Sequence, residues 1–356
     1  MAKIELRKAA TLADVAKAAG VSKGTASNVF NRPEVVRDEV RRRVRDAATS
    51  IGFRGPDPKG RLLSAGKVNA IGVATVEPLG YFFTDPFARV LMTGITEACD
   101  ESGTGISLVS AANEEELAWN VHSALVDGFI LFCLEAADQL ITASRERQLP
   151  FVALAFSPNY ENISVVSIDN VAAAEVAAGH LLELGHRRFA VLAMEFVPGG
   201  WGKATAERMN ATHYSASGHR VSGYFKALEA FGISTAEVPV HETLSDERTV
   251  HLALEEIFRH PSPPTAILAQ SDRIALIAMK WLRGRGISVP GDVSVIGFDG
   301  VPESATSNPP LTTIQQPIAE IGRRAVKAIL EHGNELWRET IETELVVRGS
   351  TAPPRR

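Results

Sequence analysis

The sequence has few of the residues that build disulfide-stapled domains or metal sites. Only two cysteines, Cys99 and Cys133, occur in 356 residues, and each lies beside or within an apolar segment. In a reducing compartment this placement is typical of small buried side chains and disfavours a disulfide. The nine histidines are scattered, and no Cys/His cluster has the spacing of a zinc site. We therefore expect no metal and no cofactor.

Long apolar runs are also missing. No run approaches the roughly 20 residues that cross a bilayer, and residues 1–8 alternate in charge where a secretory signal would be apolar. Hydrophobic residues make up 45% of the chain and charged residues 22%, as in globular proteins. These features predict a cytoplasmic protein of two or three domains with no membrane contact.

The net charge of −5 hides a strong polarity along the chain. Residues 1–67 hold fifteen Lys and Arg against seven Asp and Glu, an excess of +8 that leaves −13 for the remainder. A small basic module on an acidic body is expected where one end of a protein meets a polyanion. A solvated basic surface is the alternative that charge alone leaves open.

Residues 11–31 have the pattern of two short helices joined by a tight turn. Thr11 and Asp14 form a capping-box-like start, the first helix stops at Gly20, and Ser22 can cap the second helix. This geometry places the second helix in the major groove of DNA. Candidate contacts on that helix, with Gly24 offering backbone only, are Lys23, Gly24, Thr25, Ser27 and Asn28.

A third helix is predicted from about Arg37 to Ile51. Its apolar positions form one stripe that would close a small core over the first two helices, while the arginines at 41, 42, 43 and 45 lie largely off that stripe. The stripe consists of Val40, Val44, Ala47, Ala48 and Ile51.

These motifs resemble the lactose-repressor (LacI/GalR) family of bacterial transcription regulators. The resemblance covers nearly the whole chain, through residues 11–16, 19–22, 25–29 and 31, and later through 184–188, 220–223, 289–299 and 310–314. It implies that residues 1–55 form a helix-turn-helix DNA-binding head. Further candidate DNA contacts within this head are Thr11, Leu12, Ser22 and Asn31.

Residues 56–67, which are rich in Pro and Gly, indicate a hinge between domains. The resemblance implies a short helix that forms on operator DNA, with Leu63 wedged into the minor groove and Arg61 as a further contact. Leu62 is the alternative wedge, and a plain flexible linker is the alternative hinge. Gly60 stands where the family favours alanine, at a helical cost of roughly 1 kcal/mol, so the hinge should need DNA or a partner to order.

From residue 68 onward, short apolar runs alternate with helical stretches. Runs at 70–75, 105–109, 128–132 and 151–154 predict the buried parallel strands of one doubly wound lobe. Runs at 188–192, 238–240, 265–269 and 293–298 predict a second lobe, and another strand is expected near 345–347. The predicted fold class is therefore α/β, with an all-α helix-turn-helix head and two doubly wound lobes.

The family resemblance implies that the two lobes are of periplasmic-binding-protein type, with three crossings of the chain between them. On this basis we assign residues 68–167 and 311–335 to the N-terminal lobe of the effector domain. Residues 168–310 and 336–356 are assigned to its C-terminal lobe.

Ligands of doubly wound sheets bind beyond the carboxyl ends of the strands, so the cleft between the lobes is the candidate small-molecule site. The resemblance implies that Arg220 and Asp299 grip the effector, and that Asp85 and Phe87 contact it. The alternative role for the charged residues is a helix cap or a salt bridge between lobes.

Two further ligand contacts are predicted with less support from the family pattern. Asp272 follows a predicted strand, where family members vary in the residue before it. Trp201 lies near the start of a long segment, 195–217, rich in Gly, Ala and Thr, and could stack on a sugar or pack locally.

Together these features predict a transcription regulator, a repressor in the first hypothesis, that binds a near-palindromic operator as a homodimer, with a tetramer also open. A small polar effector, with a sugar or sugar derivative favoured, would bind between the lobes and alter DNA binding. A nucleobase, a nucleoside or a partner protein is the alternative signal. An enzyme is a distant third hypothesis, because no dinucleotide, P-loop or G-x-S-x-G motif is present.

Overall fold

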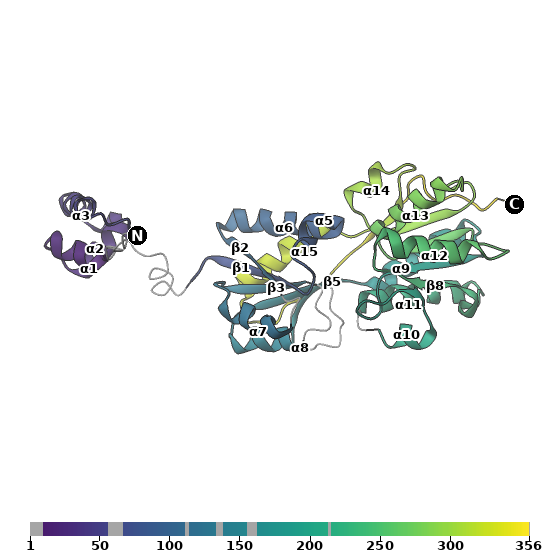
Figure 1. The fold of residues 1–356 in the computed structure, drawn as a ribbon, viewed down its shortest axis with the longest axis horizontal. Helices are drawn as coiled ribbons and strands as arrows, with labels where there is room; N and C mark the ends of the chain where they lie inside the picture. The colour runs from purple at the N-terminus through teal and green to yellow at the C-terminus, as the bar shows by residue number, and fades with distance from the viewer. Residues whose placement is uncertain are drawn as a thin grey trace, which may run out of the picture. The chain divides into compact units, whose positions relative to one another are not determined.

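The computed structural model describes residues 10–55, 67–110, 114–132, 138–154, 162–212 and 215–355 (Figure 1). The chain divides into two compact units, Met1–Val68 and Asn69–Arg356, and each contains its own hydrophobic core. Among the described residues, no helix has both the length and the apolar character that crossing a bilayer requires.

Within residues 10–55, the first unit has three α-helices and one short 3₁₀ turn. The predicted caps are confirmed: Thr11 and Asp14 form a capping box, in which the Thr11 amide donates to Asp14 Oδ2 at 2.9 Å, and Ser22 Oγ accepts from the Thr25 amide at 3.0 Å. Gly20, with φ +63°, makes the turn between the first two helices. The elements are α1 (Leu12–Ala18), α2 (Lys23–Asn31), η1 (Pro33–Val35) and α3 (Asp38–Ser50).

The core of this unit lies where the three helices meet. Val15, Val29 and Val44, one from each helix, are buried together. The predicted stripe of α3 is confirmed, with Val44 and Ala48 buried and its other members packed at the margin. Such a small core leaves the polar face of α2 free for another molecule.

The first lobe of the second unit is built on a six-stranded sheet whose order is β12-β5-β4-β3-β1-β2. All of its neighbouring strands are parallel. The strands are β1 (Ala70–Thr75), β2 (Gly105–Ser110), β3 (Gly128–Phe132), β4 (Phe151–Leu154), β5 (Ser164–Ile168) and β12 (Arg338–Ile341).

Helices cover both faces of this first sheet. Figure 1 shows α5, α6 and α15 on one face and α7 and α8 on the other. Because successive strand residues point to opposite faces, Ile130 packs with the α6 and α15 side while Phe129 and Leu131 pack with the α7 and α8 side. The helices are α5 (Tyr81–Thr84), α6 (Pro86–Ser102), α7 (Glu114–Ser123), α8 (Asp138–Glu146) and α15 (Ile318–Lys327), which continues as a π-helical turn, η3 (Ala328–His332).

The second lobe is built on a seven-stranded sheet whose order is β13-β11-β10-β9-β6-β8-β7. Its central strands are parallel, and antiparallel strands, β13 and β7, close its two edges. The strands are β6 (Phe189–Ala193), β7 (Gly202–Lys203), β8 (Val240–Glu242), β9 (Ala266–Ala269), β10 (Ser294–Asp299), β11 (Thr312–Gln315) and β13 (Glu344–Val346).

Helices also cover both faces of the second sheet. Val191 and Leu268 pack on the side of α9 and α11, whereas Leu192 and Ile267 pack on the side of α12 and α13. The predicted fold class is therefore confirmed, since both sheets are mainly parallel and doubly wound. The helices are α9 (Asn170–Glu183), α10 (Ala206–Asn210), α11 (Ser215–Ala230), η2 (Thr235–Glu237), α12 (Glu247–Phe258), α13 (Asp272–Gly284) and α14 (Pro302–Thr306).

The chain passes between the lobes three times within the described residues. It leaves β5 for α9, returns from β11 to α15, and leaves β12 for β13. Very few residues separate the two elements at each passage: 169, 316–317 and 342–343. The three expected crossings are thus present, and short connectors hold the two sheets with their carboxyl edges toward a common cleft.

Two expected lobe boundaries are corrected by the strand pairing. We assigned 311–335 wholly to the N-terminal lobe, but β11 pairs with β10 of the second sheet. We assigned 336–356 wholly to the C-terminal lobe, but β12 pairs with β5 of the first sheet. Both strands are short, and β12 is an edge strand with a charged, half-exposed sequence, so neither has the continuous apolar run that marks a buried strand.

Close contact between α6 and α15 generates a stability prediction. A Cβ at Gly94 would lie 1.8 Å from the Ala319 carbonyl oxygen, so Gly94→Ala must push the two helices apart. We expect this change to lower the free energy of unfolding by about 2 kcal/mol or more. The measurement is urea denaturation of the full chain followed by circular dichroism.

Gly179→Ala is the matched control, because Gly179 lies inside α9 and its new Cβ would meet nothing within 4 Å. That change should stabilise the protein by about 0.5–1 kcal/mol through helix propensity. Equal effects of the two substitutions would contradict the close packing of α6 on α15.

Candidate functional site

The head presents a polar surface at the start of α2. Ser22, Lys23, Gly24 and Asn28 are exposed, while Thr25 and Ser27 are half-buried. Ser22 is committed to capping, with its hydroxyl 2.9 Å from Thr25 Oγ1. Lys23 and Asn28 are thus the predicted contacts whose side chains project most freely from this helix.

The other predicted contacts in the head are partly engaged within it. Thr11 caps α1, Leu12 packs against the core, and the Asn31 side-chain amide donates to Ser27 Oγ at 3.1 Å. The hinge candidates Arg61 and Leu63 lie outside the described residues. The basic residues Arg42, Arg43 and Arg45 are exposed on α3.

The second unit contains a cavity of about 580 Å³ bounded by both lobes. Its first-lobe wall comes from the turn after β1 and the start of α6, and its second-lobe wall from the segments after β6, β9 and β10 and from α11. Its apolar lining includes Tyr81, Phe87, Phe132, Met194 and Leu244. This size and location are typical of small-molecule sites.

Asp85 and Phe87, which the family resemblance predicts as effector contacts, lie on the first-lobe side of the cavity. Asp85 Oδ1 caps α6 by accepting from the Ala88 amide at 3.0 Å, and its Oδ2 lies 3.1 Å from Arg273 Nη1 of the second lobe. The Phe87 ring lies parallel to that of Phe132, with centroids 6.1 Å apart. Asp85 is therefore both a cap and part of an ion pair between lobes, the two structural roles held open for it.

Arg220 and Asp299 form a buried pair at the back of the cavity. Arg220 Nη1 lies 3.5 Å from Asp299 Oδ1, and its guanidinium sits 3.7 Å from the centroid of the Phe298 ring. Arg220 also donates to Asn170 Oδ1 at 2.9 Å and to the Gln270 carbonyl oxygen. Burial raises the pKa of Asp299 well above its usual range, while the Arg220 charge opposes that rise.

Asp272 has a different place from the one expected. It is fully buried and is absent from the described residues that line the cavity. Its Oδ2 accepts from the amides of Gly300 and Val301 at 2.8 and 2.9 Å, and its Oδ1 accepts from Thr313 Oγ1 at 2.6 Å. The predicted ligand contact is thus corrected to a tie between three segments at the carboxyl edge of the sheet.

Trp201 is also corrected, because it does not line the cavity. Its side chain is 45% exposed, and the Arg248 guanidinium lies 5.0 Å from its ring centroid. The segment before it is fixed by buried Glu242, whose Oε1 accepts from the Phe196 amide at 2.7 Å. Local packing, which was the alternative for Trp201, describes its position.

Three charged residues of the cavity were missed from the sequence: Glu77, Glu195 and Arg273. Glu77 and Glu195 each come two residues after a strand end, and Arg273 comes four residues after β9. Burial raises the pKa of both Glu77 and Glu195. Their position beyond a parallel strand was the available signal, since that is where such sheets bind ligands.

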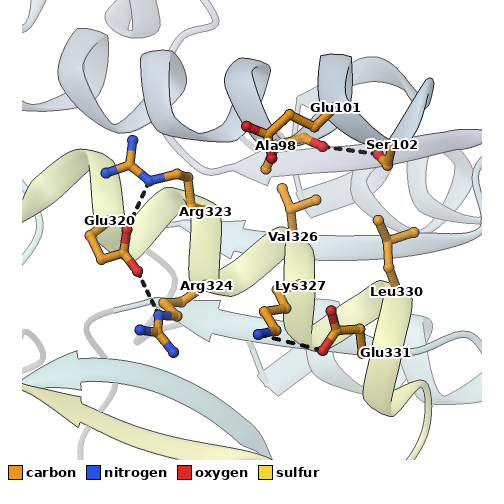
Figure 2. A pocket seen from close by; sticks show the side chains of 10 residues that line it. All are labelled: Ala98, Glu101, Ser102, Glu320, Arg323, Arg324, Val326, Lys327, Leu330 and Glu331. Atoms are coloured by element: carbon orange, nitrogen blue, oxygen red, sulfur yellow. Dashed lines mark hydrogen bonds and ion pairs between the residues drawn. The ribbon is translucent and has the colours of Figure 1, made fainter.

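A second cavity, of about 440 Å³, lies between α6 and α15 of the first lobe (Figure 2). Its lining combines Ala98, Val326 and Leu330 with charged side chains that pair with one another, such as Glu320 with Arg323 and Arg324. In Figure 2 the Lys327 and Glu331 side chains also approach each other. Because this charge is paired within the lining, the cavity between the lobes is the better candidate for a ligand site.

Two different family models match the two units of the chain. A model of bacterial regulatory proteins of the lacI family matches residues 11–55, and a periplasmic binding protein-like domain matches residues 178–351. An HTH-type transcriptional regulator of Mycobacterium tuberculosis is 36% identical over 358 residues, 98% of each chain. The chain belongs to the lacI family.

Other lacI-family comparisons agree with this assignment. The HTH-type transcriptional repressor CytR of Escherichia coli is 31% identical over 96% of each chain. A solved complex of the transcriptional regulator CelR with cellobiose is 28% identical, with a TM-score of 0.69, and covers 96% of this chain and 99% of that one. The chain is therefore a DNA-binding transcription regulator with a ligand-binding domain, and not an enzyme.

The structural role of Asp272 generates a second prediction. Asp272→Asn should lower the free energy of unfolding by about 1–3 kcal/mol, because the side-chain amide keeps only one acceptor oxygen, so either the Gly300 and Val301 amides or the Thr313 hydroxyl lose the acceptor that the carboxylate supplies. Asp100→Asn, at an exposed position of α6, is the control and should change stability by less than about 0.5 kcal/mol. Urea denaturation measures both, and an Asp272→Asn protein of unchanged stability would contradict this role.

Proposed function

We propose that this lacI-family protein is a repressor that binds its operator as a homodimer and changes its DNA affinity when a small polar effector binds between the lobes. The observation that carries the proposal is the cavity of about 580 Å³, which is lined by residues of both lobes in the same chain as a basic helix-turn-helix head. A relative that is 31% identical bears the name of a repressor, which favours that direction of control.

On the DNA side, α2 enters the major groove. Asn28 makes the base-reading contact, since a side-chain amide pairs with adenine through two hydrogen bonds, and Lys23 binds guanine or phosphate. Ser22, Thr25 and Ser27 fix the helix on the backbone, with Thr11, Leu12 and Asn31 beside them. Arg61 and Leu63 of the hinge contact the minor groove once the operator is bound.

A homodimer follows from the size of the head. A single three-helix head contacts only a few base pairs, and two heads on a near-palindrome supply the surface that tight and specific binding needs. A tetramer is compatible with the same head. Sedimentation of the protein with and without operator DNA distinguishes the two states.

On the ligand side, the effector fills the cavity between the lobes. Asp85, Arg220 and Asp299 offer hydrogen bonds at its polar ends, and Phe87 gives its ring an apolar face. A sugar is the favoured class, supported by the regulator solved with cellobiose. The parallel Phe87 and Phe132 rings favour a nucleobase or nucleoside as the second candidate, because flat bases stack on aromatic faces.

Coupling to DNA uses contacts that join the lobes. Asp85 pairs with Arg273, and Arg89 pairs with Glu303, so both pairs span the two sides of the cleft. An effector that binds one arrangement of the lobes more tightly shifts the population toward it, by an amount set by the difference in affinity. The lobes then alter the spacing of the heads in the dimer.

The proposal is tested by fluorescence anisotropy of the full chain on DNA from upstream of its own gene, at several salt concentrations and against a scrambled duplex. We expect selective binding whose logarithmic affinity falls linearly with the logarithm of salt concentration. Equal affinity for both duplexes would overturn the DNA-binding part of the proposal.

Replacement of the base-reading side chain gives a third prediction. Asn28→Ala should reduce selective DNA affinity by about 1–3 kcal/mol and leave binding to the scrambled duplex nearly unchanged, because the lost bonds are to a base edge. Thr49→Ala, at the exposed end of α3, is the control in the same anisotropy assay. Parallel losses on both duplexes would show that Asn28 contacts only the backbone.

A fourth prediction concerns the apolar wall of the cavity. Phe87→Ala should weaken effector binding about tenfold or more while DNA affinity without effector is kept, because the stacking surface is lost. Phe231→Ala removes an exposed aromatic ring away from the cavity and serves as the control. Titration calorimetry with the active compound measures both variants, and unchanged affinity in Phe87→Ala would move the site elsewhere.

A further inference from the structure

Two glutamates occupy equivalent places in the two lobes and line the same cavity. Glu77 is the second residue after β1, and Glu195 is the second residue after β6, which are the first strands of their respective lobes along the chain. Each lies where the carboxyl edge of its sheet meets the cleft. Each lobe therefore contributes one of these two carboxylates to the cavity.

The positive charges of the cavity are already engaged. Arg220 pairs with Asp299 at 3.5 Å, and Arg273 pairs with Asp85 at 3.1 Å. Among the described residues, no hydrogen bond or ion pair reaches the Glu77 carboxylate, and the Glu195 carboxylate accepts from the Gly199 amide alone, at 2.8 Å. Four acidic and two basic side chains line the described cavity, so its charge stays negative even when buried Asp299 is protonated.

Burial and nearby negative charges raise the pKa of both glutamates, as expected in a cavity with more acidic than basic side chains. Burial and then the nearby Asp85 charge raise the pKa of Glu77, with Arg273 opposing. Burial also raises the pKa of Glu195, and the charges of Glu77, Glu242 and Asp246 add to that rise, against the Gly199 hydrogen bond. The charge of Glu77 therefore acts on Glu195 across the cleft.

We propose that Glu77 and Glu195 determine specificity, making the cavity accept uncharged polyhydroxylated ligands and reject their phosphorylated or carboxylated forms. An ionised carboxylate is only an acceptor, so it binds a ligand hydroxyl that donates and repels a ligand oxyanion. A ligand with hydroxyl groups on two sides reaches one glutamate in each lobe and holds the lobes together. This inference rests on the proposed small-molecule site.

The test uses pairs of compounds that differ by one phosphate group. The probes are ribose with ribose 5-phosphate, glucose with glucose 6-phosphate, and a nucleoside with its 5′-monophosphate, together with cellobiose, each titrated calorimetrically into the full chain. We expect binding by at least one uncharged compound, and binding of its phosphate ester that is weaker by about 100-fold.

The double variant Glu77→Gln/Glu195→Gln keeps the size of both side chains and removes both charges. We expect it to reduce the preference for the uncharged compound at least tenfold, mainly through tighter binding of the phosphate ester. Glu101→Gln/Glu237→Gln removes the same two charges at exposed positions outside this cavity and should keep the preference. Thermal melting of each variant establishes that it is folded.

The outcomes separate this inference from the proposed function. Equal binding of a compound and its phosphate ester, or an unchanged preference in the cavity variant, would overturn the selectivity and leave the small-molecule site standing. An equal loss of preference in the control variant would assign it to overall charge and would also overturn the inference. If none of the uncharged compounds and none of the phosphate esters binds, the small-molecule site itself is overturned.

Discussion

The three short passages of the chain between the lobes are the constraint on which the rest of the second unit depends. Each passage leaves few residues between an element of one lobe and an element of the other. Two parallel sheets joined in this way must present their carboxyl edges to one cleft, where side chains that follow the strands converge. The same connectors limit how far the lobes separate, so a ligand acts on their relative closure.

Some polar side chains at this cleft stabilise the fold, and others face the cavity where a ligand would bind. Hydrogen bonds to the Asp272 carboxylate connect the ends of β9, β10 and β11, and buried Glu242 accepts a hydrogen bond from the segment after β6. Arg220 and Asp299 neutralise each other at the back of the cavity. Beside these paired groups, the cavity offers a ligand an aromatic face and the two carboxylates of Glu77 and Glu195, one from each lobe.

Much of the fold followed from local signals in the sequence. The helix caps at Thr11 and Ser22 and the core stripe of α3 depend on residues three or four positions apart, so a single sequence contains the whole pattern. Eight strands were found from their apolar runs, but the buried strands β5 and β11 were not predicted. The edge strand β12 was not predicted, because its exposed side chains interrupt any apolar run. Its place in the first sheet depends on pairing with a strand about 170 residues earlier.

The site was less accessible to sequence reasoning, because its geometry is set by contacts between distant segments. Asp272 stands at a strand end like a ligand contact, but its partners at Gly300, Val301 and Thr313 lie 28 to 41 residues away. Trp201 is turned toward Arg248 by a loop whose anchor, Glu242, is on another strand. The signal for Glu77 and Glu195 was the position of each residue just beyond a parallel strand.

The proposal that the cavity controls DNA binding is tested most directly by comparing DNA affinity with and without a compound in the cavity. Anisotropy of labelled upstream DNA should be recorded with the full chain, with and without a saturating compound that calorimetry has shown to bind the cavity. Coupling between the cavity and the head predicts a shift in DNA affinity of about fivefold or more. A compound that fills the cavity while DNA affinity stays the same would contradict the account.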